Sequence, residues 1–431
     1  MNISPRPRSV LRQRPVVAWA LYDWANSAFA TTVMAGFFPV FFKQYWNAGI
    51  AATESTFRLG VTSGLASLLV ALLAPVVGAI ADRSSSRVRS LMFCTVLGAA
   101  ATAGLALIGQ GQWMVAVFFY VAASLGFWGG IVFNDSLLLH VAEPEDYDLV
   151  SGYGYALGYL GGGLLFALNV AMTLHPAAFG LADASAAVRV SFVTVGAWWL
   201  LFALPLAFCV EERRLAPALP PAEAVRQGLR ELAGTVCELG RYRPVLLFLA
   251  AYWLYIDGVN TVIKMAVDYG LSLGFEASDL VAALLLTQFV AFPAALGFGW
   301  LGRRIGPRRG IFLALGVYVA ATCYAYFITG VRDFFVLAAV VGLVQGGIQS
   351  LSRSYFGRLV PEGKSSEFFG FYNMMGKFAA VLGPLLTGIV ARLTGDPRLS
   401  ILSIVLLFAG GGVMLVVAAR AERRAATVTL S

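Results

Sequence analysis

Twelve long apolar runs, separated by short polar loops, make up most of this sequence and restrict the folds open to it. A helix needs about 20 apolar residues to cross the hydrocarbon core of a bilayer. Only 13% of the residues are charged, against about 25% in a typical soluble domain. We therefore expect an all-α membrane protein with twelve transmembrane helices, near residues 16–42, 59–81, 90–109, 112–139, 151–174, 190–210, 244–270, 279–301, 310–328, 334–356, 367–392 and 399–419.

The basic residues indicate how these spans are oriented. A twelve-span topology puts both termini on one side of the membrane, and most basic residues of the loops fall on that side. The opposite loops hold only Arg58, Arg189, Arg332 and Arg398. Because cytoplasmic loops are enriched in Lys and Arg, we expect a multi-pass protein of the cell (inner) membrane, surrounded by lipids, with both termini in the cytoplasm. The net charge of +8 follows this topology, and no basic face interleaved with aromatic residues indicates nucleic-acid binding.

The two halves of the chain repeat the same motifs in the same order. The first and seventh spans both contain D-x-x-N, with Asp23 and Asn26 in one and Asp257 and Asn260 in the other. The fourth span reads "GGIVFNDS" and the tenth "GGIQSLSRS". The fifth reads "SGYGYALGYLGGG" and the eleventh "FGFYNMMGKFAAVLGP". Four ordered matches predict two parallel six-helix pseudo-repeats, the architecture of major facilitator transporters.

The longest loop lies between these repeats. We expect an N-terminal six-helix bundle over 1–210, a cytoplasmic linker over 211–243 and a C-terminal six-helix bundle over 244–431. Within the linker, apolar residues recur at helical intervals from Val225 to Leu239, with charged residues on the other faces. That pattern predicts an amphipathic helix on the cytoplasmic surface.

Several of these segments resemble one family. Together with "ALYDWANSAFATT", "GAIADRSSSRVR" and "QFVAFPAALGFG", they are similar to the vacuole-effluxer (autophagy-related permease-like) family of the major facilitator superfamily, over about residues 16–415. The resemblance implies a twelve-span secondary transporter. Fungal relatives are associated with moving amino acids out of the vacuole, and the substrates of bacterial relatives are generally unassigned. The chain departs from the superfamily pattern at Arg303, where the loop of the second half normally has an acid.

Charged residues inside the spans are candidates for a transport path. A charge at the bilayer centre costs roughly 2.5–3.5 kcal/mol on insertion scales, so such residues normally face a bundle interior or a watery cavity. Asp257, Asn260 and Lys264 lie on one helical stripe, and Asp23 and Asn26 share a face. We expect both stripes to face a central cavity, where the carboxylates bind solute or protons. Asp23 is alternatively a residue of the cytoplasmic helix end that bonds a neighbouring helix.

Lys377 is a cation near the middle of the eleventh span. No acid stands three or four residues from it on its own helix. Its partner must therefore come from another span, with Asp23, Asp257 or a substrate carboxylate as candidates. A compact ammonium suits the carboxylate of an amino-acid-like solute. The alternative is a fixed salt bridge between helices.

A second set of charges lies at the cytoplasmic span ends. Asp135 and Arg353 end the fourth and tenth spans and fall one residue apart in the "GGI" register of the repeat. They are candidates for a gate that closes by charge pairing, or equally for helix-end residues bonded to loops. The loop after the second span carries three more candidates, expected to hold the bundles together in one state: Asp82, Arg83 and Arg87.

The inventory of motifs argues against an enzyme. His140 and His175 lie near span ends, and the chain has no nucleophile elbow, no phosphate-binding loop and no metal-ligand cluster. We expect a monomer without cofactors that moves a small solute, an amino acid or similar carboxylate, by alternating access as proton-coupled efflux. Two alternatives remain open: an exporter of hydrophobic cations, and a non-transporting receptor or scaffold on the same fold.

Overall fold

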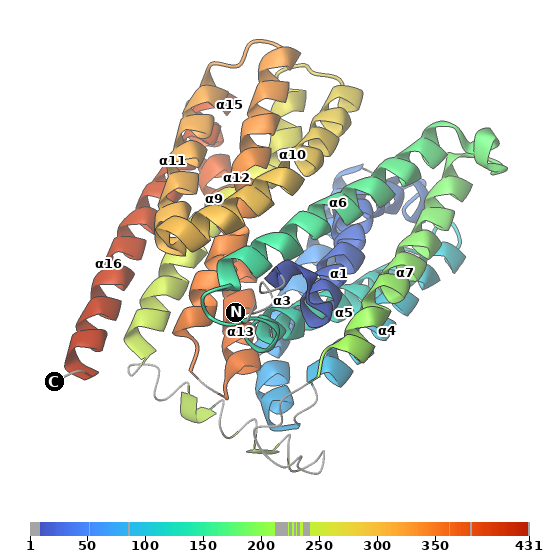
Figure 1. Ribbon diagram of the computed structural model, residues 1–431. Helices are drawn as coiled ribbons and strands as arrows, with labels where there is room; N and C mark the ends of the chain where they lie inside the picture. Colours follow the sequence, from blue (N-terminus) through green and yellow to red (C-terminus); the bar gives the residue numbers. More distant parts are fainter. Residues whose placement is uncertain are drawn as a thin grey trace, which may run out of the picture.

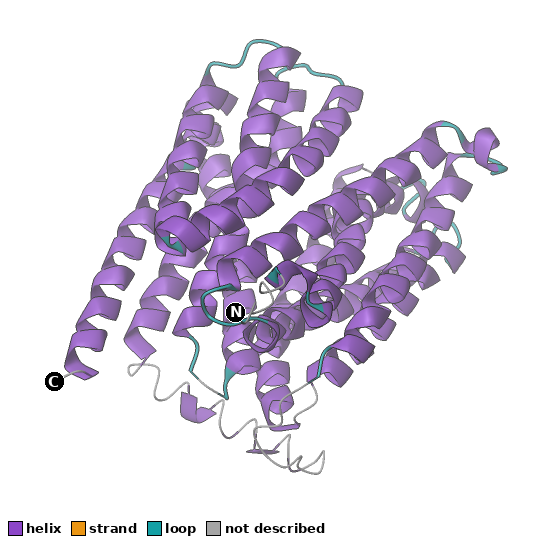
Figure 2. Cartoon of the chain, viewed as in Figure 1, coloured by secondary structure: helices purple, strands orange, loops and turns teal. Residues whose placement is uncertain are grey.

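Helices make up nearly all of the part of the protein that the computed structural model describes (Figure 2). This part comprises residues 9–50, 52–84, 87–211, 223, 226–227, 230, 233–235, 242–361, 363–379 and 382–429. Within it, eleven helices are long and apolar enough to cross a membrane. A further helix, α3, contains the shorter apolar stretch Leu68–Ala79. The expected multi-pass, all-α membrane fold is confirmed.

The first half of the chain forms six spans. The first is a continuous helix from Arg14 to Trp46 in which π-helical turns alternate with α-helical ones. Short 3-10 turns, η1, η4 and η5, cover Val10–Arg12, Leu105–Leu107 and Pro176–Phe179. The helices of this half are α1 (Arg14–Ala28), η2 (Phe29–Phe37), α2 (Phe38–Phe41), η3 (Phe42–Trp46), α3 (Ala52–Ser84), α4 (Arg87–Gly104), α5 (Trp113–Val141), α6 (Tyr147–Leu174) and α7 (Ala184–Cys209).

The second half forms six further spans, of which the eleventh is interrupted. That span was expected as one run over 367–392. In the structure α13 ends at Phe378, and the next residue, Ala379, has a non-helical ψ of 29°. Helix α14 is described from Leu382 onward, and residues 380 and 381 lie outside the described part. Most of the linker, including most of its predicted amphipathic helix, lies outside the described residues. The helices of this half are α9 (Arg243–Ser272), α10 (Ala277–Ile305), α11 (Pro307–Tyr326), α12 (Val331–Leu359), α13 (Ser365–Phe378), α14 (Leu382–Thr394), α15 (Pro397–Leu402) and α16 (Val405–Thr429).

Short polar side chains begin several of these helices. The Asp183 carboxylate accepts a hydrogen bond from the Ala186 amide (2.7 Å), at the start of α7. Asp333 does the same for the Gly330 amide (3.2 Å), at the start of α12. Such caps satisfy amides that have no partner within the helix. Gly306 has φ +89°, a conformation that favours glycine, and makes the tight turn between α10 and α11.

Each half has its own buried core. One cluster is built from residues between Val16 and Val210, and the other from residues between Val245 and Ala418. The two bundles converge at the end where the chain leaves α7 and enters α9, and fan apart at the other (Figure 1). We call the converging end, which also holds the C-terminus of α16, the linker end.

Glycines bring the halves together at the linker end, and they do so twice in the same way. A Cβ on Gly152 of α6 would lie 2.7 Å from the Ala295 carbonyl oxygen of α10. In the other half of the repeat, a Cβ on Gly370 of α13 would lie 2.7 Å from the Ala74 carbonyl oxygen of α3. Only residues without a side chain allow backbones to approach so closely. The repeated motifs therefore correspond to repeated contacts.

Candidate functional site

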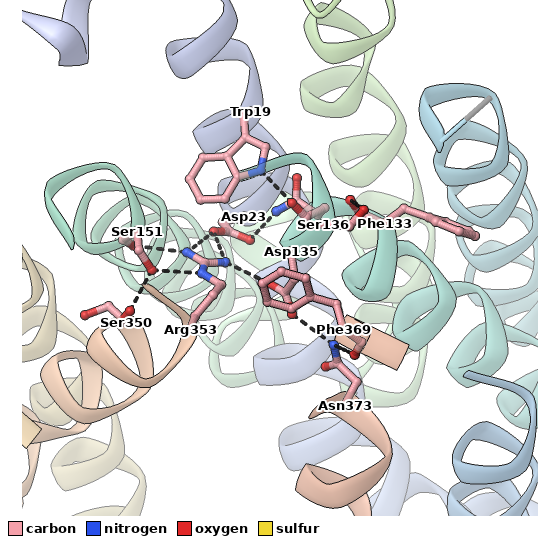
Figure 3. A network of polar contacts seen from close by, with 11 residues as sticks. Trp19, Asp23, Phe133, Asp135, Ser136, Ser151, Ser350, Arg353, Phe369 and Asn373 are labelled. Carbon is pink, nitrogen blue, oxygen red and sulfur yellow. Dashed lines mark hydrogen bonds and ion pairs between the residues drawn. The ribbon is translucent and has the colours of Figure 1, made fainter. Parts of the chain in front are cut away.

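Arg353 of α12 lies at the centre of a polar network between the two halves (Figure 3). Its Nη1 donates to Asp23 Oδ2 and to Asp135 Oδ1, in both cases over 3.1 Å. Its Nε donates to Ser151 Oγ (2.9 Å) and its Nη2 to the Ser151 carbonyl (3.0 Å). The Arg353 side chain is 2% exposed, that of Asp135 5% and that of Asp23 14%. One cation of the second half thus binds two carboxylates of the first.

The remaining carboxylate oxygens of this network accept amide hydrogen bonds. Asn134 donates to Asp23 Oδ1 (2.9 Å), and Asn373 of α13 donates to Asp135 Oδ2 (3.0 Å). Aromatic rings flank the guanidinium, with its carbon 4.3 Å from the centre of the Tyr155 ring and 4.7 Å from that of Trp19. Every charged group of the cluster is therefore held by several partners, as buried charges require.

The structure brings Asp23 together with Asp135 and Arg353, which the sequence singled out as a pair. The expected charge pair of Asp135 and Arg353 is present as a contact, and its role as a gate stays a prediction. For Asp23, a bond to a neighbouring helix was one of two expectations. It bonds Asn134 of its own half, and its ion pair with Arg353 crosses between the halves.

A second ion pair between the halves was not anticipated from the sequence. Arg358 of α12 donates to both carboxylate oxygens of Asp148 on α6, over 2.9 and 3.0 Å. The Ser354 hydroxyl donates to the same carboxylate. The Asp148 side chain is 1% exposed. The sequence did contain a signal for this pair. Asp148 lies at the start of the fifth span, and Arg358 lies at the end of the tenth span, on the same side of the membrane.

The loops at the linker end add weaker links. Arg303, the residue that departs from the superfamily pattern, has its Nη2 3.3 Å from Asp146 Oδ1, and its side chain is half exposed. Arg87 of α4 donates from Nε to Ser366 Oγ of α13 (3.0 Å), so it contacts the other half, and its role in holding the bundles together stays a prediction. The side chains of Asp82 and Arg83 lie outside the described residues, and their proposed role stays a prediction.

Lys377 of α13 lies against an aromatic ring of the first half. Its Nζ is 3.0 Å from the ring centre of Trp128 on α5. A cation over the face of an indole is attracted by the ring's quadrupole. The sequence predicted a partner from another span, either Asp23, Asp257 or a substrate carboxylate, and did not anticipate an aromatic ring; the acidic or solute partner stays a prediction.

Asp257 and Asn260 of α9 bond the backbone around the break in the eleventh span. The two Asp257 oxygens accept the amides of Leu382 and Gly383, each over 2.9 Å, and the residue is fully buried. Asn260 Nδ2 donates to the Ala379 carbonyl (3.3 Å).

Direct contact of these two side chains with a solute stays a prediction. In the first repeat Asn26 is buried at 4% exposure, and its contact with a solute is equally untested. The Lys264 side chain lies outside the described residues. Among the residues that the structure describes, His, Cys, Asp and Glu form no group of three suited to a metal ion.

Comparison with known proteins supports the resemblance found in the sequence. Residues 48–145 and 140–427 match the family described as "Vacuole effluxer Atg22 like". An MFS-type transporter of Bacillus subtilis, YxiO, is 39% identical over 400 residues, which are 92% of this chain and 93% of that protein. Autophagy-related protein 22 of Yarrowia lipolytica is 27% identical over 299 residues, which are 62% of this chain and 50% of the fungal protein.

Solved structures show the same fold. The human organic anion transporter MFSD10 (TETRAN) superposes with a TM-score of 0.71 at 15% identity, over 93% of this chain and 99% of that one. At this identity the likeness concerns the fold alone. It confirms the major facilitator architecture, and YxiO and MFSD10 are named as transporters, as expected for a protein that is not an enzyme. The chain belongs to the vacuole effluxer Atg22-like family of major facilitator transporters.

Proposed function

We propose that the protein is a secondary active transporter that exports a small solute with a carboxylate group, such as an amino acid, by alternating access coupled to protons. The observation that carries this proposal is the placement of Lys377 on Trp128. The cation comes from one half and the ring from the other, so a solute bound there contacts both halves. An ammonium is a compact charge with three donors, which suits a carboxylate.

The linker end is proposed to face the cytoplasm, because the basic loop residues gather there. The bundles converge at this end and fan apart at the other (Figure 1). In this orientation the conformation is closed toward the cytoplasm. Alternating access then requires Arg353 and Arg358 to separate from their carboxylate partners on α1, α5 and α6.

The cluster around Arg353 supports coupling to protons. Arg353 carries one positive charge, and the carboxylates of Asp23 and Asp135 together carry two negative charges when ionised. One proton on either carboxylate makes the cluster neutral. Opening the linker end removes the guanidinium, and a buried charge left without its partner is costly. We expect a proton on Asp23 or Asp135 to accompany that opening.

An exporter of hydrophobic cations is supported less well. Such a protein needs an acid that can serve as counter-ion to its substrate. In this conformation Asp23 and Asp135 bind Arg353, and Asp257 accepts backbone amides. A cation would have to displace one of these partners.

Thermal unfolding of the purified chain, in the presence of candidate solutes, tests the proposal. The panel contains amino acids, short peptides, organic acids and lipophilic cations. The variants are Lys377→Ala and Asp257→Asn, with Lys364→Ala as the matched control. Lys364 is also a lysine near α13, but its Nζ bonds Thr235 Oγ1 (2.6 Å) in the linker. We expect a carboxylate solute to raise the Tm of the parent and of Lys364→Ala, and to leave Lys377→Ala unchanged.

Two results would overturn the proposal. Stabilisation by lipophilic cations that is lost in Asp257→Asn would indicate the cation exporter. A panel that shifts neither the parent nor any variant would remove the support for a carboxylate solute and favour a receptor or scaffold. If a stabilising solute is found, its pH-dependent exchange in proteoliposomes with Asp135→Asn tests the coupling to protons.

A further inference from the structure

The break in the eleventh span lies next to the proposed solute site. Lys377 is in the last turn of α13, and α14 begins at Leu382. A proline two residues into α14, Pro384, disfavours a continuous helix, because its ring clashes with the carbonyl four residues earlier. Prolines at positions 75, 205 and 293 are nevertheless accommodated inside long helices. Something besides Pro384 must therefore stabilise the interruption.

Two residues of α9 hold both sides of that break. The Asp257 carboxylate accepts hydrogen bonds from the first amides of α14, those of Leu382 and Gly383. Asn260 donates a hydrogen bond to the Ala379 carbonyl, just beyond the end of α13. Their spacing of three residues puts both side chains on one face of α9. Backbone groups freed by a broken helix are costly in a membrane unless another element bonds them. The D-x-x-N pair supplies an acceptor and a donor where each is needed.

The surroundings show that α14 is fitted closely to α9. The Thr261 hydroxyl donates to Asp257 Oδ1 (3.3 Å), and Asp257 and Thr261 are both fully buried. A Cβ on Gly383 would lie 2.8 Å from Asp257 Oδ1 and closer still to Thr261 Oγ1. Any other residue at this position would push the amide away from the carboxylate. A carboxylate at a helix N-terminus is further favoured by the helix dipole.

The D-x-x-N motif of the first repeat, Asp23 and Asn26, makes different contacts. Asp23 bonds Arg353 and Asn134, and the corresponding partner helix, α6, is continuous from Tyr147 to Leu174. The second pair is thus adapted to the interruption, not simply inherited from the repeat.

We infer that Asp257 and Asn260 are positioning residues that splint the α13–α14 break and so place Lys377 on Trp128. They act on the solute through Lys377 and not by touching it. This inference rests on the proposed function only in regarding Lys377 as the solute's anchor. The placement of Lys377 is measurable without any solute, so the two ideas fail separately.

A fluorescence experiment on the full chain tests the splint. The native cysteines are replaced by alanine, and Lys377→Cys is labelled with bimane, whose emission is quenched by a nearby tryptophan. Trp128→Phe identifies the part of the quenching that comes from Trp128. We expect Asp257→Ala to lose that part of the quenching and Asn260→Ala to lose less. Asp257→Asn, which keeps an acceptor oxygen, is expected to lie between the parent and Asp257→Ala.

The control removes a comparable cap elsewhere in the same half. Asp333→Ala deletes the carboxylate that accepts the Thr329 and Gly330 amides at the start of α12, and it is expected to keep the parent's quenching. Quenching that survives in Asp257→Ala and Asn260→Ala would overturn the inference. If Asp257→Ala fails to fold, Asn260→Ala and Asp257→Asn decide, and parental quenching in both would overturn it equally.

Discussion

Asp135 and Arg353, which lie 3.1 Å apart, occupy equivalent positions in the two repeats. The "GGI" motifs put them one residue apart, but the contacts between the halves set the register differently. Asp135 and Arg353 are 218 positions apart in the sequence. The same shift relates Ser136 to Ser354 and Asp148 to Ser366. The hydrogen bond from Ser366 to Ser136 and the one from Ser354 to Asp148 are therefore equivalent contacts of the two repeats. Opposite charges at matching positions therefore meet where the halves converge. A homologous pair of like charges would repel at the same place.

The first prediction concerns the cation of this network. Arg353→Ala leaves the carboxylates of Asp23 and Asp135 without their shared partner in a site that is almost closed to solvent. Removing one partner of a buried ion pair typically costs about 3–5 kcal/mol. We expect the free energy of unfolding in detergent to fall by about this amount, as measured by chemical denaturation followed by circular dichroism.

A compensated variant serves as control. Arg353→Met combined with Asp23→Asn and Asp135→Asn removes all three charges at similar side-chain volume, and replacing a buried ion cluster in this way is often neutral for stability. We expect this triple variant to regain most of the loss. Equal stability of Arg353→Ala and the parent would show that the network contributes nothing to the folded state.

The second prediction concerns the close approach of α6 and α10. Gly152→Val places a side chain where Ala295 O lies only 2.7 Å from the first added carbon. We expect the halves to separate at the linker end. The measurement is maleimide labelling of Ser350→Cys in a cysteine-free chain, because Ser350 is fully buried. Gly388→Val is the matched control, since a Cβ at Gly388 meets open space. Equal labelling of both variants would contradict the expectation.

The third prediction ranks two ion pairs that join the start of α6 to helices of the second half, one to α12 and the other to α10. Asp148 is 1% exposed and binds Arg358 through both oxygens, whereas Asp146 pairs with the half-exposed Arg303. Exposed pairs are worth about 0–1 kcal/mol, and buried charge-assisted hydrogen bonds are worth more. Asp148→Asn should therefore increase labelling of Ser350→Cys far more than Asp146→Asn. Similar labelling of the two variants would show that Arg358 does not hold the linker end closed.

Much of the fold could be predicted because it depends on local pattern. The lengths of the apolar runs predicted the membrane spans, and the repeated motifs predicted the division into two halves. The end of α13 at Phe378 could not be predicted from the neighbouring residues, since the Ala-Ala-Val that follows is compatible with a helix. Pro384 was a signal, but Pro293 stands inside a continuous helix. The difference comes from α9, whose Asp257 and Asn260 bond the freed backbone.

The candidate site was predictable in its members but less so in its pairings. The cost of burying charge singled out Asp23, Asp257 and Lys377. Which groups meet depends on how twelve helices pack, and a helical stripe cannot specify that. Lys377 contacts Trp128, and nothing in the sequence distinguishes this tryptophan from the other apolar residues of its span. Asp148 went unnoticed because it begins its helix, where acids are common for local reasons.

The last prediction tests the contact between Lys377 and Trp128 without a solute. A double-mutant cycle combines Lys377→Met, which keeps most of the side-chain volume, with Trp128→Leu, which removes the ring. Cation–π contacts contribute about 0.5–1 kcal/mol when exposed and about 2 kcal/mol or more when desolvated. Because Lys377 is partly buried, we expect a coupling free energy of unfolding within that range. The same cycle on Arg304 and Trp300, whose ring is half exposed and 4.0 Å from the guanidinium carbon, provides the reference. A coupling between Lys377 and Trp128 that does not exceed zero would mean that the ring does not hold the cation.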